Sequence, residues 1–196
     1  MTTDDPAPVL VVVRGNSGSG KTTTAREVRR RYGRGCALVE QDYLRRIILR
    51  EHDGSNDDPA APTFIATTTA TLLGLGYHVV LEGILRTDRY GQVLHRLLAD
   101  HRGPSAVYYI DLTFEETVRR HEGRAHEVNF GPEQMRDWYL PRDLLGTPGE
   151  HVLDASRTLD ETVTTILHTS GLAAAAPHTA CPTRCTHCES QRAHIH

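Results

Sequence analysis

A glycine-rich segment near the start of the chain carries the residue types that bind phosphate. Residues 15–22 read GNSGSGKT, which satisfies the pattern G-x-x-x-x-G-K-[ST] between an apolar run and a helix-forming stretch. In such a loop the backbone amides and the helix N-terminus face one anion, the lysine reaches the β- and γ-phosphates, and the hydroxyl offers an oxygen to magnesium. The segment therefore predicts a nucleotide-phosphate site, the alternative being a glycine-rich turn without a ligand.

The expected nucleotide contacts are nine consecutive residues: Gly15, Asn16, Ser17, Gly18, Ser19, Gly20, Lys21, Thr22 and Thr23. Among them, Lys21 is the predicted catalytic residue and Thr22 a predicted magnesium ligand. The sequence has no N-K-x-D segment, the element that reads guanine in GTPase switches. ATP with Mg²⁺ is therefore the expected pair.

Two carboxylates follow apolar runs at positions where the phosphate acceptor and the metal would lie. Asp42 belongs to the segment EQDY, and Glu82 ends the run VVLE. In a doubly wound sheet both would lie beside the phosphate loop. We predict that Asp42 accepts or orients the proton of an acceptor hydroxyl, and that Glu82 supports magnesium. The alternatives are a helix N-cap for Asp42 and an ordinary strand-end residue for Glu82.

A cluster of arginines lies in the segment RRHEGR, residues 119–124, at the end of a predicted helix. Arg120 and Arg124 are predicted to be catalytic, as part of a lid near residues 121–135 that closes on the phosphates and neutralises developing charge. For Arg119, a solvated helix face with pairs to Glu115 or Glu116 is an equal alternative.

Strand-like and helix-like segments alternate along the chain, which is typical of an α/β fold. The predicted strands cover 9–13, 37–42, 77–81, 106–110 and 151–155. The predicted helices cover 21–32, 43–51, 64–75, 89–101, 115–122 and 159–168, with a further helix starting near 132. The polar segment 52–62 is a candidate substrate loop. We expect a three-layer P-loop NTPase fold with a five-stranded parallel sheet and a short lid.

The order of these motifs resembles that of a known group of kinases. GNSGSGKT, EQDY, VVLEGIL and the arginine-bearing helix resemble the uridine kinase and phosphoribulokinase-like P-loop kinases over roughly residues 9 to 125. The layout is also similar to that of chloramphenicol phosphotransferase and the zeta-toxin kinases, which use different acceptors. The resemblance implies that Asp42 is catalytic, that Glu82 supports the metal, and that Arg120 and Arg124 grip phosphates.

Length, composition and charge favour one globular domain that acts on small molecules. The chain has 196 residues, 38% of them hydrophobic, and a formal net charge of −3, which does not favour nucleic acid as a partner. The N-terminus lacks the pattern of a signal peptide, and no apolar run is long enough to span a membrane, so a cytoplasmic protein is expected. Monomer and homodimer are not distinguished.

The predicted organisation is a disordered N-terminus at 1–8, a kinase domain at 9–170 and a flexible tail at 171–196. The tail contains Cys181, Cys185 and Cys188 with histidines nearby, a spacing that could hold zinc. A tail without metal is the alternative that its composition favours.

These observations predict an ATP-dependent kinase that transfers the γ-phosphoryl group to a hydroxyl of a small molecule, such as a nucleoside, a sugar or an antibiotic-like compound. The alternative is an ATP-binding regulatory module, or an ATPase coupled to a partner. A kinase for RNA ends is a third possibility that the acidic balance makes unattractive.

Overall fold

The computed structural model describes residues 7–51, 59–123 and 131–176. Within these ranges the chain forms a five-stranded, all-parallel sheet with the order β2-β3-β1-β4-β5. The strands are β1 (Leu10–Gly15), β2 (Cys36–Glu40), β3 (His78–Gly83), β4 (Ser105–Ile110) and β5 (His151–Leu153). This confirms the predicted sheet and, with it, the three-layer P-loop NTPase fold.

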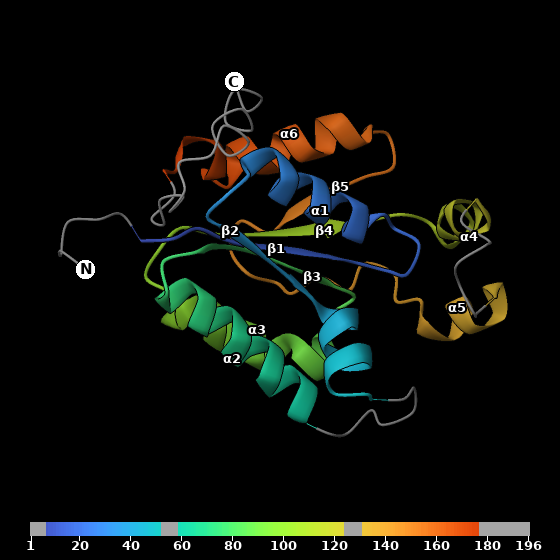
Figure 1. The fold of residues 1–196 in the computed structure, drawn as a ribbon. Coiled ribbons are helices and arrows are strands. Elements are labelled where there is room, and N and C mark those ends of the chain that lie inside the picture. Colours follow the sequence, from blue (N-terminus) through green and yellow to red (C-terminus); the bar gives the residue numbers. More distant parts are fainter. Residues whose placement is uncertain (1–6, 52–58, 124–130, 177–196) are drawn as a thin grey trace.

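Helices cover both faces of the sheet. They are α1 (Lys21–Tyr32), α2 (Ala60–Gly74), α3 (Thr87–Asp100), α4 (Phe114–Glu122), α5 (Pro132–Trp138) and α6 (Leu159–Thr169), with a π-helical turn η1 (Tyr43–Ile48) and a 3-10 turn η2 (Leu172–Ala174). Figure 1 shows α1 and α6 on one face, α2 and α3 on the other, and α4 and α5 beyond one end of the sheet. None of the helices in the described ranges is long and apolar enough to cross a membrane.

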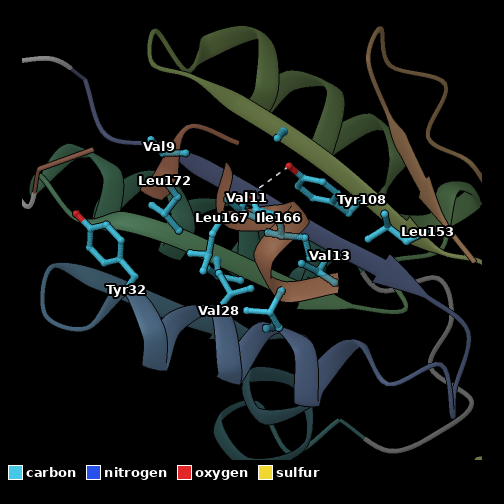
Figure 2. Packing of buried hydrophobic residues seen from close by; sticks show 14 of the residues in the cluster. Val9, Val11, Val13, Val28, Tyr32, Tyr108, Leu153, Ile166, Leu167 and Leu172 are labelled. Atoms are coloured by element: carbon cyan, nitrogen blue, oxygen red, sulfur yellow. Dashed lines mark hydrogen bonds between the residues drawn. The ribbon is translucent and has the colours of Figure 1, made fainter. Parts of the chain in front are cut away.

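The central strand β1 is apolar from Leu10 to Val13 because both of its faces are covered. Val11 and Val13 belong to the cluster packed under α1 and α6, together with Val28 and Ile166 (Figure 2). The alternate residues, such as Val12, belong to the cluster on the side of α2 and α3. The continuous run VLVVV is thus explained by a strand buried on both sides, as the sequence predicts.

Two predicted helices differ from the observed ones. Of the segment predicted as a helix over 43–51, residues Tyr43–Ile48 form the π-helical turn η1, and the amide of Leu49, which follows it, donates to the Leu44 carbonyl over 2.9 Å. Helix α2 begins at Ala60, earlier than the predicted start at 64. Pro62 does not prevent this, because it occupies the first turn, where a backbone N–H has no partner within the helix.

The described core continues beyond the boundary that the sequence suggests at residue 170. Leu172 is fully buried against the cluster under α1 and α6. The Tyr32 hydroxyl donates to the Ala175 carbonyl over 3.0 Å, and a ring nitrogen of His78 lies 3.0 Å from the Ala176 carbonyl. Residues 171–176 are therefore part of the domain. Residues 1–6 and 177–196, which include most of the predicted N-terminal and C-terminal tails, lie outside the described residues.

Candidate active site

The phosphate loop joins β1 to α1 and depends on glycine. Gly18 and Gly20 have φ angles of 79° and 92°, in the left-handed region that residues with a Cβ atom rarely adopt. A Cβ atom on Gly18 would also lie 2.5 Å from the carbonyl oxygen of Thr117 in α4. The loop is therefore held against α4 at a point where only a glycine fits.

The N-terminus of α1 is left open for an anion. No side chain caps α1 at Gly20, and its first turn contains no acidic residue. By contrast, α4 and α6 are capped by Thr113 and Thr158 and have acidic first turns. In addition, the buried Ser19 Oγ has no hydrogen-bond partner in the described part of the chain. An uncapped helix dipole with an unpaired hydroxyl beside it fits a bound phosphate group.

Both predicted magnesium ligands lie together next to this loop. Thr22 Oγ1 donates to Glu82 Oε2 over 3.1 Å, and Glu82 is only 2% exposed at the end of β3. Burial raises the pKa of Glu82, whereas the charge of Lys21 and the hydrogen bond from Thr22 lower it. Mg²⁺ is usually held by one or two protein oxygens together with phosphate oxygens and water. This pair of oxygens fits such an ion.

Asp42 lies just beyond the carboxyl end of β2 with its side chain directed to solvent. The side chain is 62% exposed, makes no capping hydrogen bond to η1, and has Arg46 as its ion-pair partner at 3.8 Å. A role as helix cap is therefore not what the structure shows. The charge of Asp42 contributes to the raised pKa of Glu82, so the two carboxylates lie within electrostatic range.

Gln41 fixes the ends of β2 and β3 relative to each other, a role that the sequence did not suggest. Its side chain is buried, and its Oε1 accepts from the Leu85 amide over 3.1 Å. A Cβ atom on Gly83 would collide with the Gln41 side chain. Close packing of Gln41 on Gly83 therefore holds Asp42 and Glu82 at neighbouring strand ends.

Helix α4 brings one predicted catalytic arginine to the phosphate loop. Arg120 Nη1 lies 3.4 Å from the Ser19 carbonyl, and its Nε donates to Glu116 over 2.6 Å. Arg119 is exposed and pairs with the same glutamate, which both arginines hold at a pKa of about 2. Arg124 and the central part of the predicted lid, 124–130, lie outside the described residues.

Asn16 supports the loop from behind. Its Nδ2 donates to the Leu140 carbonyl over 2.8 Å, and its Oδ1 accepts from the Leu140 amide over 3.0 Å. Nδ2 also reaches the Tyr109 hydroxyl at 3.2 Å. The side chain is thus committed to the segment after α5, which leaves only the Asn16 backbone to face a nucleotide.

A fully buried arginine immediately precedes the loop, and sequence reasoning missed its role. Arg14 Nη2 pairs with Asp143 Oδ2 at 3.0 Å, and Arg14 Nη1 lies 3.4 Å from Glu150 Oε1. Its Nη2 also donates to the Leu85 carbonyl over 2.8 Å, and Asp143 accepts from Thr87. The available signal was a single cation at the end of a strand that is otherwise wholly apolar.

Among the described residues, no three His, Cys, Asp or Glu side chains gather into a metal-binding group. The predicted zinc ligands Cys181, Cys185 and Cys188 lie outside those residues.

Comparison with known proteins identifies the family to which most of this chain is similar. The model of one protein family, described as an AAA domain, matches residues 10–139, from β1 to the segment after α5. No curated protein matches the chain.

Several solved structures have a similar fold at low sequence identity. An APS kinase of Mycobacterium tuberculosis, in complex with AMPPNP and APS, is 19% identical, with a TM-score of 0.64, and the match covers 83% of this chain and 97% of that one. A gluconokinase of Sinorhizobium meliloti is 18% identical, with a TM-score of 0.61 and coverage of 85% and 94%. A sugar kinase of a Janibacter species is 21% identical, with a TM-score of 0.63 and coverage of 86% and 99%. At these identities the likeness shows a shared fold.

Proposed function

The chain belongs to the AAA domain family, and on that premise we propose that it is an ATP-dependent kinase that phosphorylates a hydroxyl of a small molecule. The observation that carries the proposal is the pairing of two carboxylates with different environments. Glu82 is buried against Thr22 of the phosphate loop, whereas Asp42 is exposed beside it without a capping role. The buried Glu82 suits a metal ion, and the exposed Asp42 suits an incoming acceptor.

The phosphate side of the reaction is assigned to residues of the loop and β3. The open N-terminus of α1 and Lys21 would bind the phosphates of ATP, and Thr22 and Glu82 would hold Mg²⁺. When bound, the ion neutralises charge on the phosphate oxygens. Arg120, which reaches the loop from α4, adds a second positive charge where negative charge develops.

The acceptor side is assigned to Asp42. An ionised carboxylate within reach of an alcohol can hold the hydroxyl in line with the γ-phosphorus and accept its proton, while the new P–O bond forms and the bond from the γ-phosphorus to the departing oxygen of ADP breaks. The names of three similar structures, an APS kinase, a gluconokinase and a sugar kinase, support a small hydroxylated acceptor. Membership of the uridine kinase and phosphoribulokinase-like group is the finer proposal, supported by the motif order alone.

The test is ADP formation with ATP, Mg²⁺ and a panel of nucleosides, sugars and antibiotics. We expect at least one acceptor to raise the rate well above that without acceptor. Lys21→Ala and Asp42→Asn should each lower kcat/KM for that acceptor by at least about a hundredfold, the usual size of a lost acid–base or charge contribution. Near-native far-UV circular dichroism would show that the fold survives.

Asp100→Asn is the matched control, because Asp100 is an exposed aspartate at the far end of α3. It should retain the wild-type rate. Full activity in Asp42→Asn would remove the proposed base. Hydrolysis that depends on a protein partner and on no small acceptor would instead favour a partner-coupled ATPase.

A further inference from the structure

An ion cluster close to Asp42 has an unused carboxylate oxygen. Glu51 is 9% exposed, and its Oε2 accepts from Arg45 Nε at 3.0 Å and from Arg89 Nη2 at 3.3 Å. Its other oxygen, Oε1, is buried and has no hydrogen-bond donor in the described part of the chain. Two arginines thus hold the carboxylate in place while half of it is left without a partner.

A second unpaired polar atom belongs to Tyr90, on the same helix as Arg89. Tyr90 is 2% exposed, and its hydroxyl makes no hydrogen bond within the described residues. Burial raises its pKa, and the nearby Gln41, Arg45 and Arg89 side chains lower it, although no hydrogen bond of good geometry joins it to Gln41. The Arg89 guanidinium lies 5.5 Å from the centre of its ring. We call Arg45, Glu51, Arg89 and Tyr90 the Glu51 cluster.

Leaving such atoms unpaired is unfavourable unless something else binds them. A buried polar atom without a partner loses its hydration without compensation, and native folds contain few of them. Here an acceptor-only oxygen and a hydroxyl lie unpaired in one cluster. A ligand that donates to Glu51 and accepts from Tyr90 would remove both penalties.

The Glu51 cluster lies next to the proposed acceptor base. Burial lowers the pKa of Arg45, but the hydrogen bond to Glu51 and nearby charges, including that of Asp42, raise it overall. Asp42 directly precedes η1, the turn that carries Arg45, so the proposed base and the cluster are neighbours along the chain as well as electrostatically. A molecule with one hydroxyl at Asp42 can extend from there toward the cluster.

The chemistry of the two unpaired atoms indicates which class of ligand group the cluster would bind. An anion would place negative charge against the free oxygen of Glu51, whose own charge already engages both arginines. A hydroxyl both donates and accepts, so it satisfies Glu51 and Tyr90 without adding charge. We propose that the Glu51 cluster binds a second hydroxyl of the acceptor, which makes the acceptor a polyhydroxylated, sugar-like molecule. This inference rests on the proposed kinase function.

The experiment compares acceptors that differ in one group. ADP formation is measured with D-glucose, D-ribose and myo-inositol, with 2-deoxy-D-glucose and 2-deoxy-D-ribose, and with two single-hydroxyl compounds, N-acetylethanolamine and glycolate. We expect transfer to at least one polyol, a KM at least about tenfold higher for its deoxy analogue, and little transfer to the single-hydroxyl compounds. Equal or better transfer to N-acetylethanolamine or glycolate would overturn the proposal.

Two variants test the Glu51 cluster itself. Glu51→Gln and Tyr90→Phe should each raise the KM for the polyol at least about tenfold, with a smaller change in kcat. Tyr90→Phe should leave the melting temperature unchanged or raise it, because it removes an unpaired buried hydroxyl. An unchanged KM in both variants, or a clear loss of stability in Tyr90→Phe, would show that the cluster is structural.

The chain offers a matched control for each variant. Glu27 is also held by two arginines, Arg30 and Arg31, but on the outer side of α1, so Glu27→Gln should keep the wild-type KM. The Tyr108 hydroxyl lies 2.6 Å from Thr169 Oγ1, so Tyr108→Phe should lower the melting temperature and keep the KM.

Failure of the proposed function can be separated from failure of this subsite. If no compound is phosphorylated, binding of radiolabelled D-glucose, D-ribose and myo-inositol is measured by equilibrium dialysis. If a polyol binds to the wild type but not to Glu51→Gln, the proposed subsite is supported even though the proposed kinase function is not. Absence of binding to all three polyols at millimolar concentration would overturn it.

Discussion

Arg14 shows how a single buried charge can organise a binding loop. It lies one residue before the phosphate loop, with none of its side chain exposed, and its charge is balanced by Asp143 and Glu150. A charge removed from water in this way is tolerated only while its partners are present. The segment that carries both carboxylates is therefore tied to the start of the loop.

We predict that Asp143→Ala lowers the free energy of unfolding by about 3 kcal/mol, because Arg14 then keeps only part of its compensation. Urea denaturation measures the change. Asp160→Ala is the control, since Asp160 is 76% exposed and pairs with Arg31 at the surface. It should lose no more than about 1 kcal/mol. Equal effects of the two substitutions would contradict the role of Arg14.

At the scale of single residues, the sequence predicts those residues whose role follows from the motif in which they lie. Lys21 and Thr22 lie within one motif, and Glu82 ends a run of apolar residues, so each position follows from its neighbours. The partners of Arg14 lie 129 and 136 residues away, and no sequence pattern near Arg14 predicts them. The sequence does not single out Glu51 and Tyr90 either, because each is marked by a buried polar atom that has no hydrogen-bond partner in the described part of the chain.

Helix α1 is built to leave its first turn open while its last turns are held by ion pairs. Glu27 accepts hydrogen bonds from Arg30 and Arg31, which lower its pKa from 4.5 to about 2. Arg31 also pairs with Asp160 of α6 at 2.8 Å. These contacts join the two helices that cover one face of the sheet.

The lowered pKa of Glu27 gives a pH-dependent contribution to stability. The folded state favours the ionised form, so the contribution is full above the unfolded pKa of 4.5 and is lost as the pH falls toward 2. We predict that Glu27→Gln costs no more than about 1 kcal/mol at pH 7, since the site is solvent-screened. Urea denaturation of wild type and variant at pH 7, 5 and 3.5 should show this difference shrinking at the acidic end. A constant difference would argue against an electrostatic origin.

Most elements follow from the sequence because their ends are marked by residues with strong preferences. The sequence predicts helix α1 with the bounds that it has, between the phosphate loop and Gly33. The sequence does not predict the π-helical form of η1, because YLRRII is compatible with an ordinary helix. The packing of 171–176 was missed because LAAAA has no apolar periodicity, although Leu172 alone is enough to anchor it.

At the scale of the whole molecule, the C-terminal segment closes the core under α1 and α6. We predict that Leu172→Ala lowers the free energy of unfolding by about 2–5 kcal/mol, the usual range for a fully buried leucine. Leu159→Ala, at a leucine that is 44% exposed at the start of α6, should cost about 0.5 kcal/mol or less. Urea denaturation of both variants measures the contrast. A change of less than about 1 kcal/mol in the free energy of unfolding for Leu172→Ala would instead favour a domain that ends at residue 170.

The pairing of Arg14 with distant carboxylates also sets the order in which the protein can mature. During synthesis the complete GNSGSGKT segment emerges before Asp143 and Glu150, which follow Arg14 by 129 and 136 residues. Until then Arg14 has no counter-ion in the sheet interior, so the strand that carries the loop cannot settle in its final place. Competence to bind a nucleotide is thus acquired late, when nearly all of the domain exists.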